Sequence, residues 1–145
     1  MRQKTQQIAL WLSVVIISYS CATIAYYDAN SFKKTAELKA KTLVLVGHAD
    51  ENYNDYVKEI DEVKIMAEEL YSLQKARDIN HATIGQWKKL MEKDPATNKS
   101  VFPDFFEMWK SKGSLSNAFI DPAKTQFSEI FDEILKLESS KNKKQ

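Results

Sequence analysis

The sequence predicts an all-α protein, a small helical bundle that follows an N-terminal signal or anchor segment. Apolar residues recur every three or four positions along most of the chain, which is the period of an amphipathic helix. Glycine and proline, the residues that most often interrupt helices, occur only three times each in 145 residues. The composition, with 28% charged and 43% apolar residues, is typical of one globular domain.

The first segment, residues 1–27, has the parts of a secretory leader. A short basic start precedes an uncharged apolar stretch over residues 8–27, and Ser20 stands directly before Cys21, the only cysteine. Lipoprotein processing would cut before Cys21 and acylate it. The alternatives are an uncleaved transmembrane helix, for which 20 uncharged residues suffice, and a cleaved, free protein. All three predict that the body lies outside the cytoplasm.

The first long amphipathic stripe lies within residues 31–77. From Val46 to Leu70 the apolar residues alternate steps of three and four, while acidic residues occupy the other faces. The unbroken stripe favours one long helix. Two helices that meet near Gly47 and Asp50 are the alternative, because glycine and aspartate both permit a break there.

Two short aromatic-rich helices are expected next. Thr83 and Gln86 have the spacing of a capping box, in which the two side chains bind free backbone N–H groups, so a helix is predicted to begin there. In the second helix Pro103 suits the first turn and Gly113 suits the end.

The second long stripe covers residues 120–137 and predicts the last helix. Pro122 is interpreted as a first-turn proline that follows an Asp121 cap, since a proline farther inside would kink the helix. The bundle domain is therefore expected to cover residues 28–140. Residues 141–145 contain three lysines and are predicted to form a solvated basic tail.

The charge pattern argues against nucleic-acid binding. The leader contains two of the 21 basic residues and none of the 20 acidic ones, so the body is nearly neutral. A nucleic-acid binder needs a basic face to displace phosphate counterions. The membrane, through the anchor or lipid, and an unidentified protein are the expected partners.

The residues that could perform catalysis or bind a metal form no recognisable motif. His48, Asp50 and Glu51 are close in sequence, but residues two or three apart on a helix do not converge as an i, i+4 pair does. His81 is expected in a turn. We predict no enzyme activity, no metal and no cofactor. A hydrolase stays an alternative only if His48 or His81 lies against a carboxylate at a cleft.

The aromatic residues are the most informative part of the body. Trp87, Phe105, Phe106 and Trp109 are suited to the core of a small bundle, since short helices need bulky side chains to fill it. The alternative is that they form a surface for a partner helix or line a pocket for an apolar ligand.

Several segments of the body resemble a family of small, uncharacterised helical bacterial proteins, many of which carry a lipoprotein leader. The resemblance implies a location in the cell envelope, but it implies no activity and no functional residue. The residues that carry it most sharply are Gln86-Trp87, Phe105-Phe106, Trp109, Gly113-Ser114-Leu115-Ser116, Ala118-Phe119 and Phe131-Asp132.

The function expected from these observations is that of a membrane-tethered, non-enzymatic helical domain of the bacterial cell envelope. It would lie outside the cytoplasmic membrane or in the periplasm and act through protein–protein contacts. The alternative is a bundle that binds a lipid or another small apolar ligand in an internal cavity of several hundred cubic ångströms.

Overall fold

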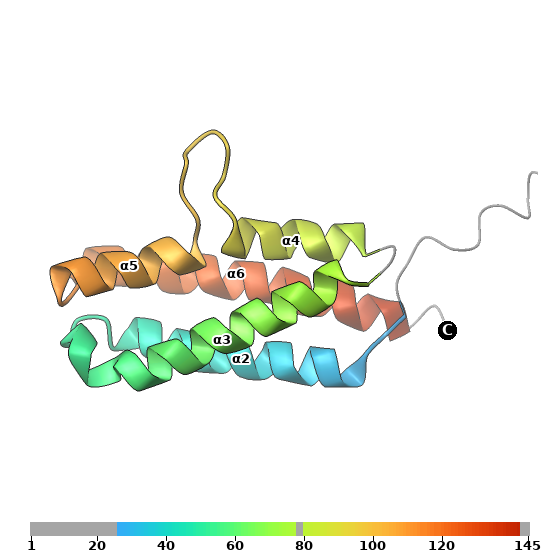
Figure 1. The fold of residues 1–145 in the computed structure, drawn as a ribbon, viewed down its shortest axis with the longest axis horizontal. Coiled ribbons are helices and arrows are strands. Elements are labelled where there is room, and N and C mark those ends of the chain that lie inside the picture. Colours follow the sequence, from blue (N-terminus) through green and yellow to red (C-terminus); the bar gives the residue numbers. More distant parts are fainter. Residues whose placement is uncertain (1–25, 78–79, 143–145) are drawn as a thin grey trace, which may run out of the picture.

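A computed structural model describes residues 26–77 and 80–142 of the chain, which form five α-helices and one 3₁₀ turn (Figure 1). No strand occurs among these residues, so the all-α prediction is confirmed for them. The elements are α2 (Ala29–Gly47), η1 (Tyr53–Tyr56), α3 (Val57–Lys75), α4 (His81–Met91), α5 (Phe102–Lys112) and α6 (Asn117–Asn142).

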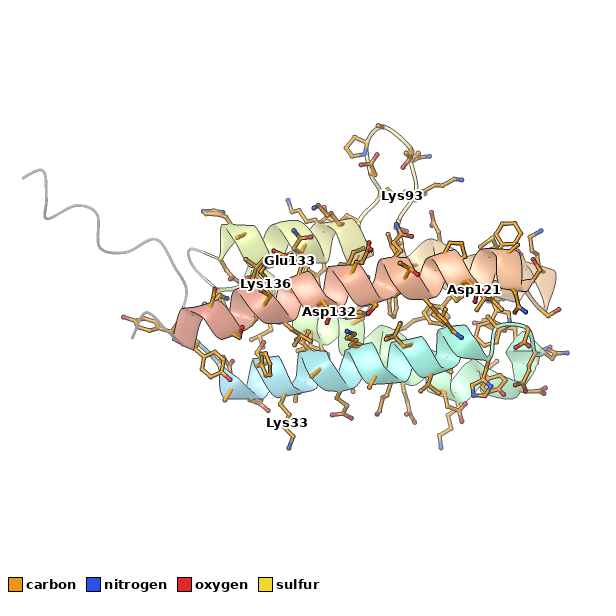
Figure 2. The ribbon with its side chains drawn as sticks, turned by 180° about the vertical axis from the view of Figure 1, so that it is seen from behind. Lys33, Lys93, Asp121, Asp132, Glu133 and Lys136 are labelled. Carbon is orange, nitrogen blue, oxygen red and sulfur yellow. The ribbon has the colours of Figure 1, made fainter. Side chains whose placement is uncertain are left out.

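The helices form a four-part bundle in which one part is divided. Helices α2, α3 and α6 are long, and the short helices α4 and α5 lie end to end as the fourth part (Figure 1). Helix α2 packs against α3 and α6, and α4 packs against the same two helices. Figure 2 shows α6 beside α2 from the opposite side. Helices α2, α3, α4 and α6 therefore each pack against two neighbouring helices, as in other four-helix bundles.

The first long stripe is divided between two antiparallel helices, so the preference for one long helix was wrong. Helix α2 ends at Gly47, and the backbone N–H of His48 binds the last carbonyls of α2. The spacing hides this break because Ala49 and Tyr53 are buried on the same side as the helical stripes. Asn52 begins the next turn, since its side chain accepts a hydrogen bond from the N–H of Asn54 at 2.9 Å.

The two short helices are confirmed, but the expected start of the first is corrected. Helix α4 begins at His81, so Thr83 lies inside it and is buried rather than capping it. Helix α5 has Pro103 in its first turn and ends at Gly113, as predicted. Gly113 has a φ of 77°, a left-handed conformation that favours glycine.

The last helix begins earlier than expected. Helix α6 starts at Asn117, so Pro122 lies inside it, and Asp121 does not cap it. Proline has no N–H, so the carbonyl of Ala118, four residues earlier, loses its usual helical partner. Ala118 and Pro122 are both exposed, so water can reach that carbonyl.

The end of the bundle that holds the two tight turns is built from aromatic rings, and we call it the aromatic end. Trp109 is fully buried and meets the edge of Tyr53 at a centroid distance of 5.6 Å. Its indole N–H donates to the carbonyl of Glu51 at 3.0 Å. Two backbone hydrogen bonds join the turns, from Tyr53 to Gly113 at 2.8 Å and from Leu115 to Ala49 at 2.6 Å. Side-chain burial and backbone hydrogen bonds therefore hold this end together.

The opposite end contains a buried chain of polar side chains, and we call it the polar end. Gln74 donates to the hydroxyl of Ser31 at 2.6 Å and accepts from Asn80 at 2.5 Å. Lys141 donates to Asn80 at 2.6 Å and forms an ion pair with Glu138. These five residues are all buried, and they connect α2, α3, α6 and the residue that precedes α4.

Lys141 also corrects the predicted basic tail. It belongs to α6 and is 5% exposed, because Glu138 and Asn80 supply the acceptors that a buried ammonium group needs. Residues 143–145 lie outside the described part of the chain.

The expected leader and anchor, including residues 1–25 and the lipidation candidate Cys21, also lie outside the described residues. Among the helices at 26–77 and 80–142, none is both long and apolar enough to cross a membrane.

Candidate functional site

A groove between α5 and α6 is the largest of the hollows that we describe, and aromatic side chains create it. Phe127 of α6 is fully buried and meets the edges of Phe102 and Phe105 of α5 at centroid distances of 6.0 and 5.6 Å. Phe106 continues the cluster, 5.0 Å from Phe102. These rings lie between the two helices and separate their backbones.

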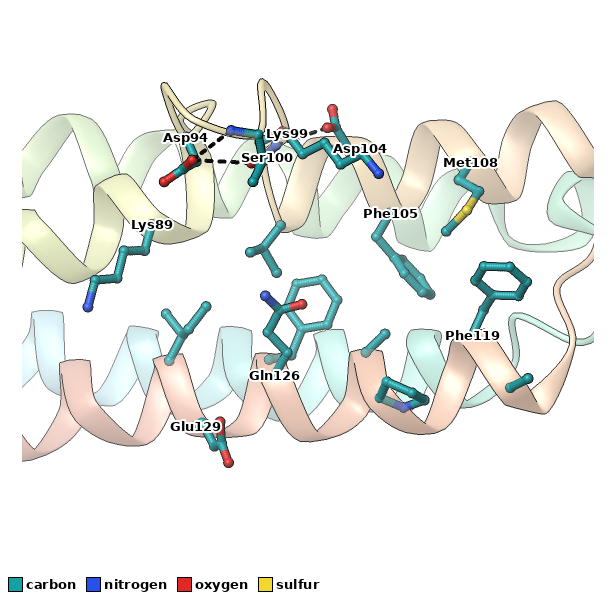
Figure 3. A pocket seen from close by; sticks show the side chains of 17 residues that line it. Lys89, Asp94, Lys99, Ser100, Asp104, Phe105, Met108, Phe119, Gln126 and Glu129 are labelled. Atoms are coloured by element: carbon teal, nitrogen blue, oxygen red, sulfur yellow. Dashed lines mark hydrogen bonds between the residues drawn. The ribbon is translucent and has the colours of Figure 1, made fainter.

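Over this aromatic layer the surface is hollowed to a volume of about 900 Å³ (Figure 3). Met108 from α5 and Phe119 from α6 point toward one another across the groove (Figure 3). Phe119 is 51% exposed, which is unusual for a phenylalanine in a small protein. The groove thus has an apolar floor that is open to solvent.

Charged and polar groups line the rim. Lys89 of α4 and Lys99 of the α4–α5 loop line the groove with their side chains well apart, and Gln126 and Glu129 lie on the α6 side (Figure 3). The rim therefore carries both signs of charge around an apolar centre.

Ser100 is the least satisfied polar residue of this site. It lines the groove and is 6% exposed, yet its hydroxyl has no hydrogen-bond partner among the described residues. Its backbone N–H does have one, since it donates to the carboxylate of Asp104 at 2.9 Å and so fixes the start of α5. A buried hydroxyl without a partner is costly and leaves a donor and an acceptor free for a ligand.

The loop that closes one end of the groove is organised by Asp94. One carboxylate oxygen accepts hydrogen bonds from the N–H groups of Ala96 and Thr97, both at 2.9 Å. The N–H groups of Thr97 and Ala96 lower the pKa of Asp94. This carboxylate therefore stabilises the turn, which includes Asn98 with a left-handed φ of 53°.

The four aromatic residues proposed as a partner surface lie in the core. Trp87, Phe106 and Trp109 are fully buried, and Phe105 is 5% exposed. They pack against other rings because the two short helices have few other bulky side chains with which to cover the long ones. They therefore do not form an exposed surface, and only Phe105 borders the groove.

The side chains that do line the groove include several that the sequence did not single out as site residues. Phe119 belongs to the aromatic-rich segment. The spacing of the apolar residues there does not show that Phe119 lies beside the core stripe of α6 and not within it. Most of the α6 residues of the groove repeat every three or four positions; they are Ala118, Phe119, Pro122, Ala123, Gln126, Phe127, Glu129 and Ile130.

The histidine candidate forms a small exposed cluster at the aromatic end. Nδ1 of His48 lies 2.7 Å from Oε1 of Glu51, and the hydroxyl of Tyr56 donates to the other oxygen at 2.6 Å. The hydrogen bonds from Tyr56 and His48 lower the pKa of Glu51, and the carboxylate raises the pKa of Tyr56 to about 12. Both oxygens are occupied, so the cluster connects the turn to η1. It lies outside the α5–α6 groove.

Within residues 26–77 and 80–142, no group of three or more His, Cys, Asp or Glu side chains is arranged to hold a metal ion. The chain matches no family model, no curated protein and no solved structure. The resemblance to a family of helical envelope proteins therefore stays a prediction.

Proposed function

We propose that the protein is a membrane-tethered, non-enzymatic domain of the cell envelope that binds an amphipathic helix of another protein in the α5–α6 groove. The observation that supports this most directly is Phe119, a large apolar side chain exposed over an apolar floor. Exposed apolar surface in a groove with a polar rim is typical of protein interaction sites.

The shape of the groove favours a helix as the bound element. Its α6 wall extends from Ala118 to Ile130, which are 12 positions apart, or about 18 Å at 1.5 Å per residue. That length corresponds to about three turns of a partner helix. Such a helix would insert apolar residues at i, i+3 or i+4 and i+7.

The rim gives an expectation for the charges of the partner. Lys89 and Lys99, at separate points of the rim, favour acidic residues beside the apolar face of the bound helix. The membrane tether is predicted from the sequence of residues 1–27, and it would place the domain in the cell envelope. It would also raise the local concentration of the domain near partners in the same membrane.

The test replaces Phe119 with a photoreactive p-benzoylphenylalanine in the full chain, in cells. We expect irradiation to give an adduct of discrete mass, whose partner peptide is identified by mass spectrometry. The control places the same group at Lys136, an exposed position of α6 outside the groove. An added Ile130→Glu substitution, which puts a charge in the groove, should abolish the Phe119 adduct. Equal adducts at both positions, or an adduct unaffected by Ile130→Glu, would contradict the proposal.

A second candidate function is the binding of an amphipathic small molecule such as a fatty acid. The free hydroxyl of Ser100 and the neighbouring Lys99 would bind a carboxylate, and the apolar floor would bind the chain. A volume of about 900 Å³ lies within the range of small-molecule sites. The expected internal cavity is replaced here by an open groove.

Titration with dansyl-undecanoic acid tests this candidate. A hydrogen bond to a charged ligand contributes about 1.5–3 kcal/mol, so Ser100→Ala should weaken binding by tenfold or more. Ser111→Ala, at an exposed serine of α5 outside the groove, is the control. Equal affinities for the two variants would exclude a role of Ser100 in binding.

A further inference from the structure

A second exposed apolar surface follows the seam between α2 and α3. Val44 of α2 and Ile65 and Leu73 of α3 are 60%, 57% and 43% exposed. They line two shallow hollows of about 310 and 340 Å³ that share Lys41 and Glu62. We call this surface the seam face. Nothing in the described chain covers it, although three large aliphatic side chains lie there.

The charges beside the seam face are separated by sign. On the α2 side the hollows are lined by Lys34 and Lys41, and on the α3 side by Glu59, Glu62 and Glu69. The α2 side also has one acid, Glu37, which forms an ion pair with Lys41 at 3.2 Å. Lys34, Glu62 and Glu69 form no ion pair with another described residue. Lys34 on the α2 row and Glu62 and Glu69 on the α3 row are therefore free for an external partner, and Lys41 would exchange Glu37 for it.

The two rows have the same spacing. Lys34 and Lys41 are seven residues apart on α2, and Glu62 and Glu69 are seven apart on α3, which is two helical turns. Lys41 and Glu62 line the same hollows, and α3 runs antiparallel to α2. Two turns from Lys41 toward the start of α2 lead to Lys34, and two turns from Glu62 toward the end of α3 lead to Glu69. Lys34 and Glu69 therefore lie at the same height along the bundle.

We propose that the seam face binds a second copy of this chain, in a symmetric dimer whose two-fold axis runs along the helices. Rotation about that axis places the α2 row of one copy over the α3 row of the other. Lys41 then meets Glu62 and Lys34 meets Glu69, and each pair forms twice. An isologous interface needs such a self-complementary surface. A two-fold axis across the helices would instead place lysine over lysine and glutamate over glutamate.

The axis has a consequence for the arrangement of the two copies. Because it runs along the helices, both copies point in the same direction, and both α2 helices begin at the same end of the dimer. This dimer leaves the α5–α6 groove of each copy open, because the groove and the seam face share no residue. The proposal is therefore independent of the function proposed for the groove.

The experiment uses two complementary variants of the full chain in detergent micelles. One carries Lys34→Glu and Lys41→Glu, and the other carries Glu62→Lys and Glu69→Lys. Donor- and acceptor-labelled copies are mixed, and energy transfer upon dilution gives the apparent dissociation constant. The control carries Lys88→Glu and Lys136→Glu, which make the same charge change as the lysine variant at exposed positions on α4 and α6. Circular dichroism verifies that each variant is folded.

We expect the unaltered chain and the control to dimerise with similar affinity. Each seam-face variant alone should bind itself at least tenfold more weakly, because like charges then face one another. A mixture of the two variants should recover affinity within about threefold of the unaltered chain, since every facing pair is again of opposite sign. The proposal is overturned if the unaltered chain stays monomeric, if the single variants dimerise normally, or if the mixture binds no better than either variant alone. Any of these results would reassign the seam face to a different occupant or to none.

Discussion

The two ends of the bundle are held together by different physical means. At the aromatic end, Trp109 is buried among other rings, and two backbone hydrogen bonds join the neighbouring turns. At the polar end, a buried chain of hydrogen bonds runs from Ser31 through Gln74 and Asn80 to Lys141 and Glu138. Both ends have buried side chains, but only the aromatic end is held together by contacts between apolar rings.

The difference determines how each end responds to substitution. Apolar burial is roughly proportional to area, so truncating one ring removes that ring's contribution and leaves a cavity. A buried polar chain depends on every partner, because removing one group leaves another unsatisfied. The aromatic end should therefore lose stability in proportion to the volume removed. At the polar end, the loss should depend on whether a single partner or a complete pair is removed.

The largest expected effect is at the aromatic end. Trp109→Ala should lower the free energy of unfolding by about 3–5 kcal/mol, because it empties a fully buried site. Urea denaturation followed by circular dichroism measures this. Trp109→Phe keeps a ring but loses the hydrogen bond to the carbonyl of Glu51, so it should cost less than Trp109→Ala. Equal losses in the two variants would show that volume does not govern this end.

The next effect sharpens the comparison at the polar end. Glu138→Leu leaves the ammonium group of Lys141 buried without its carboxylate and should cost about 3 kcal/mol. Adding Lys141→Met removes the buried ammonium charge left behind, so the double variant should recover part of that loss. The rest should stay, because Arg77 also loses its ion pair with Glu138 at 3.4 Å. The same denaturation experiment gives both values. A double variant as unstable as Glu138→Leu alone would mean that the loss comes from packing or from Arg77, and not from the charge of Lys141.

The smallest effect is on pH dependence, where the two ends should act in opposite directions. Burial lowers the pKa of Lys141 from its usual 10.5, so the unfolded chain binds that proton more tightly and stability rises as pH approaches 10.5. The hydrogen bond to Glu51 raises the pKa of Tyr56 to about 12. The folded chain then binds that proton more tightly, so stability falls between about pH 10 and 12.

Denaturation at a series of pH values from 8 to 12 separates the two groups. Lys141→Met should remove the rise below pH 10.5 and leave the fall above pH 10. Tyr56→Phe should reduce that fall, and part of it should stay because burial raises the pKa of Tyr53 and Tyr71 as well, and Tyr71 also donates a hydrogen bond to Glu92. If both variants keep the profile of the unaltered chain, neither Lys141 nor Tyr56 is a source of the pH dependence.

The sequence predicted the helical class, both short helices and the last long stripe, because each depends on local spacing. It could not locate the break after Gly47. Ala49 and Tyr53 continue the apolar spacing through the turn, so the pattern of burial does not record that the chain reverses there. The apolar period indicates which side of the chain is buried, but it does not indicate whether the chain continues in the same direction or reverses.

The candidate site was less predictable for a related reason. Trp87 and Trp109 are the bulkiest side chains and were considered for a surface, but bulk is what the core requires. Whether Phe119 is exposed depends on how far α5 stands from α6, and Phe127, distant in sequence from α5, sets that spacing. The polar end is likewise assembled through hydrogen bonds between residues up to 61 positions apart. Such contacts depend on topology and leave no local signature.

The antiparallel course of α2 and α6 has a mechanical consequence. Helix α2 begins and α6 ends at the polar end of the bundle (Figure 1). A force that pulls the start of α2 away from the end of α6 would act across the helices. It would separate α2 from α6 one turn at a time, beginning at the polar end. If the protein is tethered ahead of α2 and a partner occupies the groove beside the first half of α6, the force instead acts along the helices. Helix α6 must then slide past α2 over its whole contact at once, so their contacts must break together and not one after another. The same bundle would thus be weak when pulled by its two ends and strong when loaded between tether and groove.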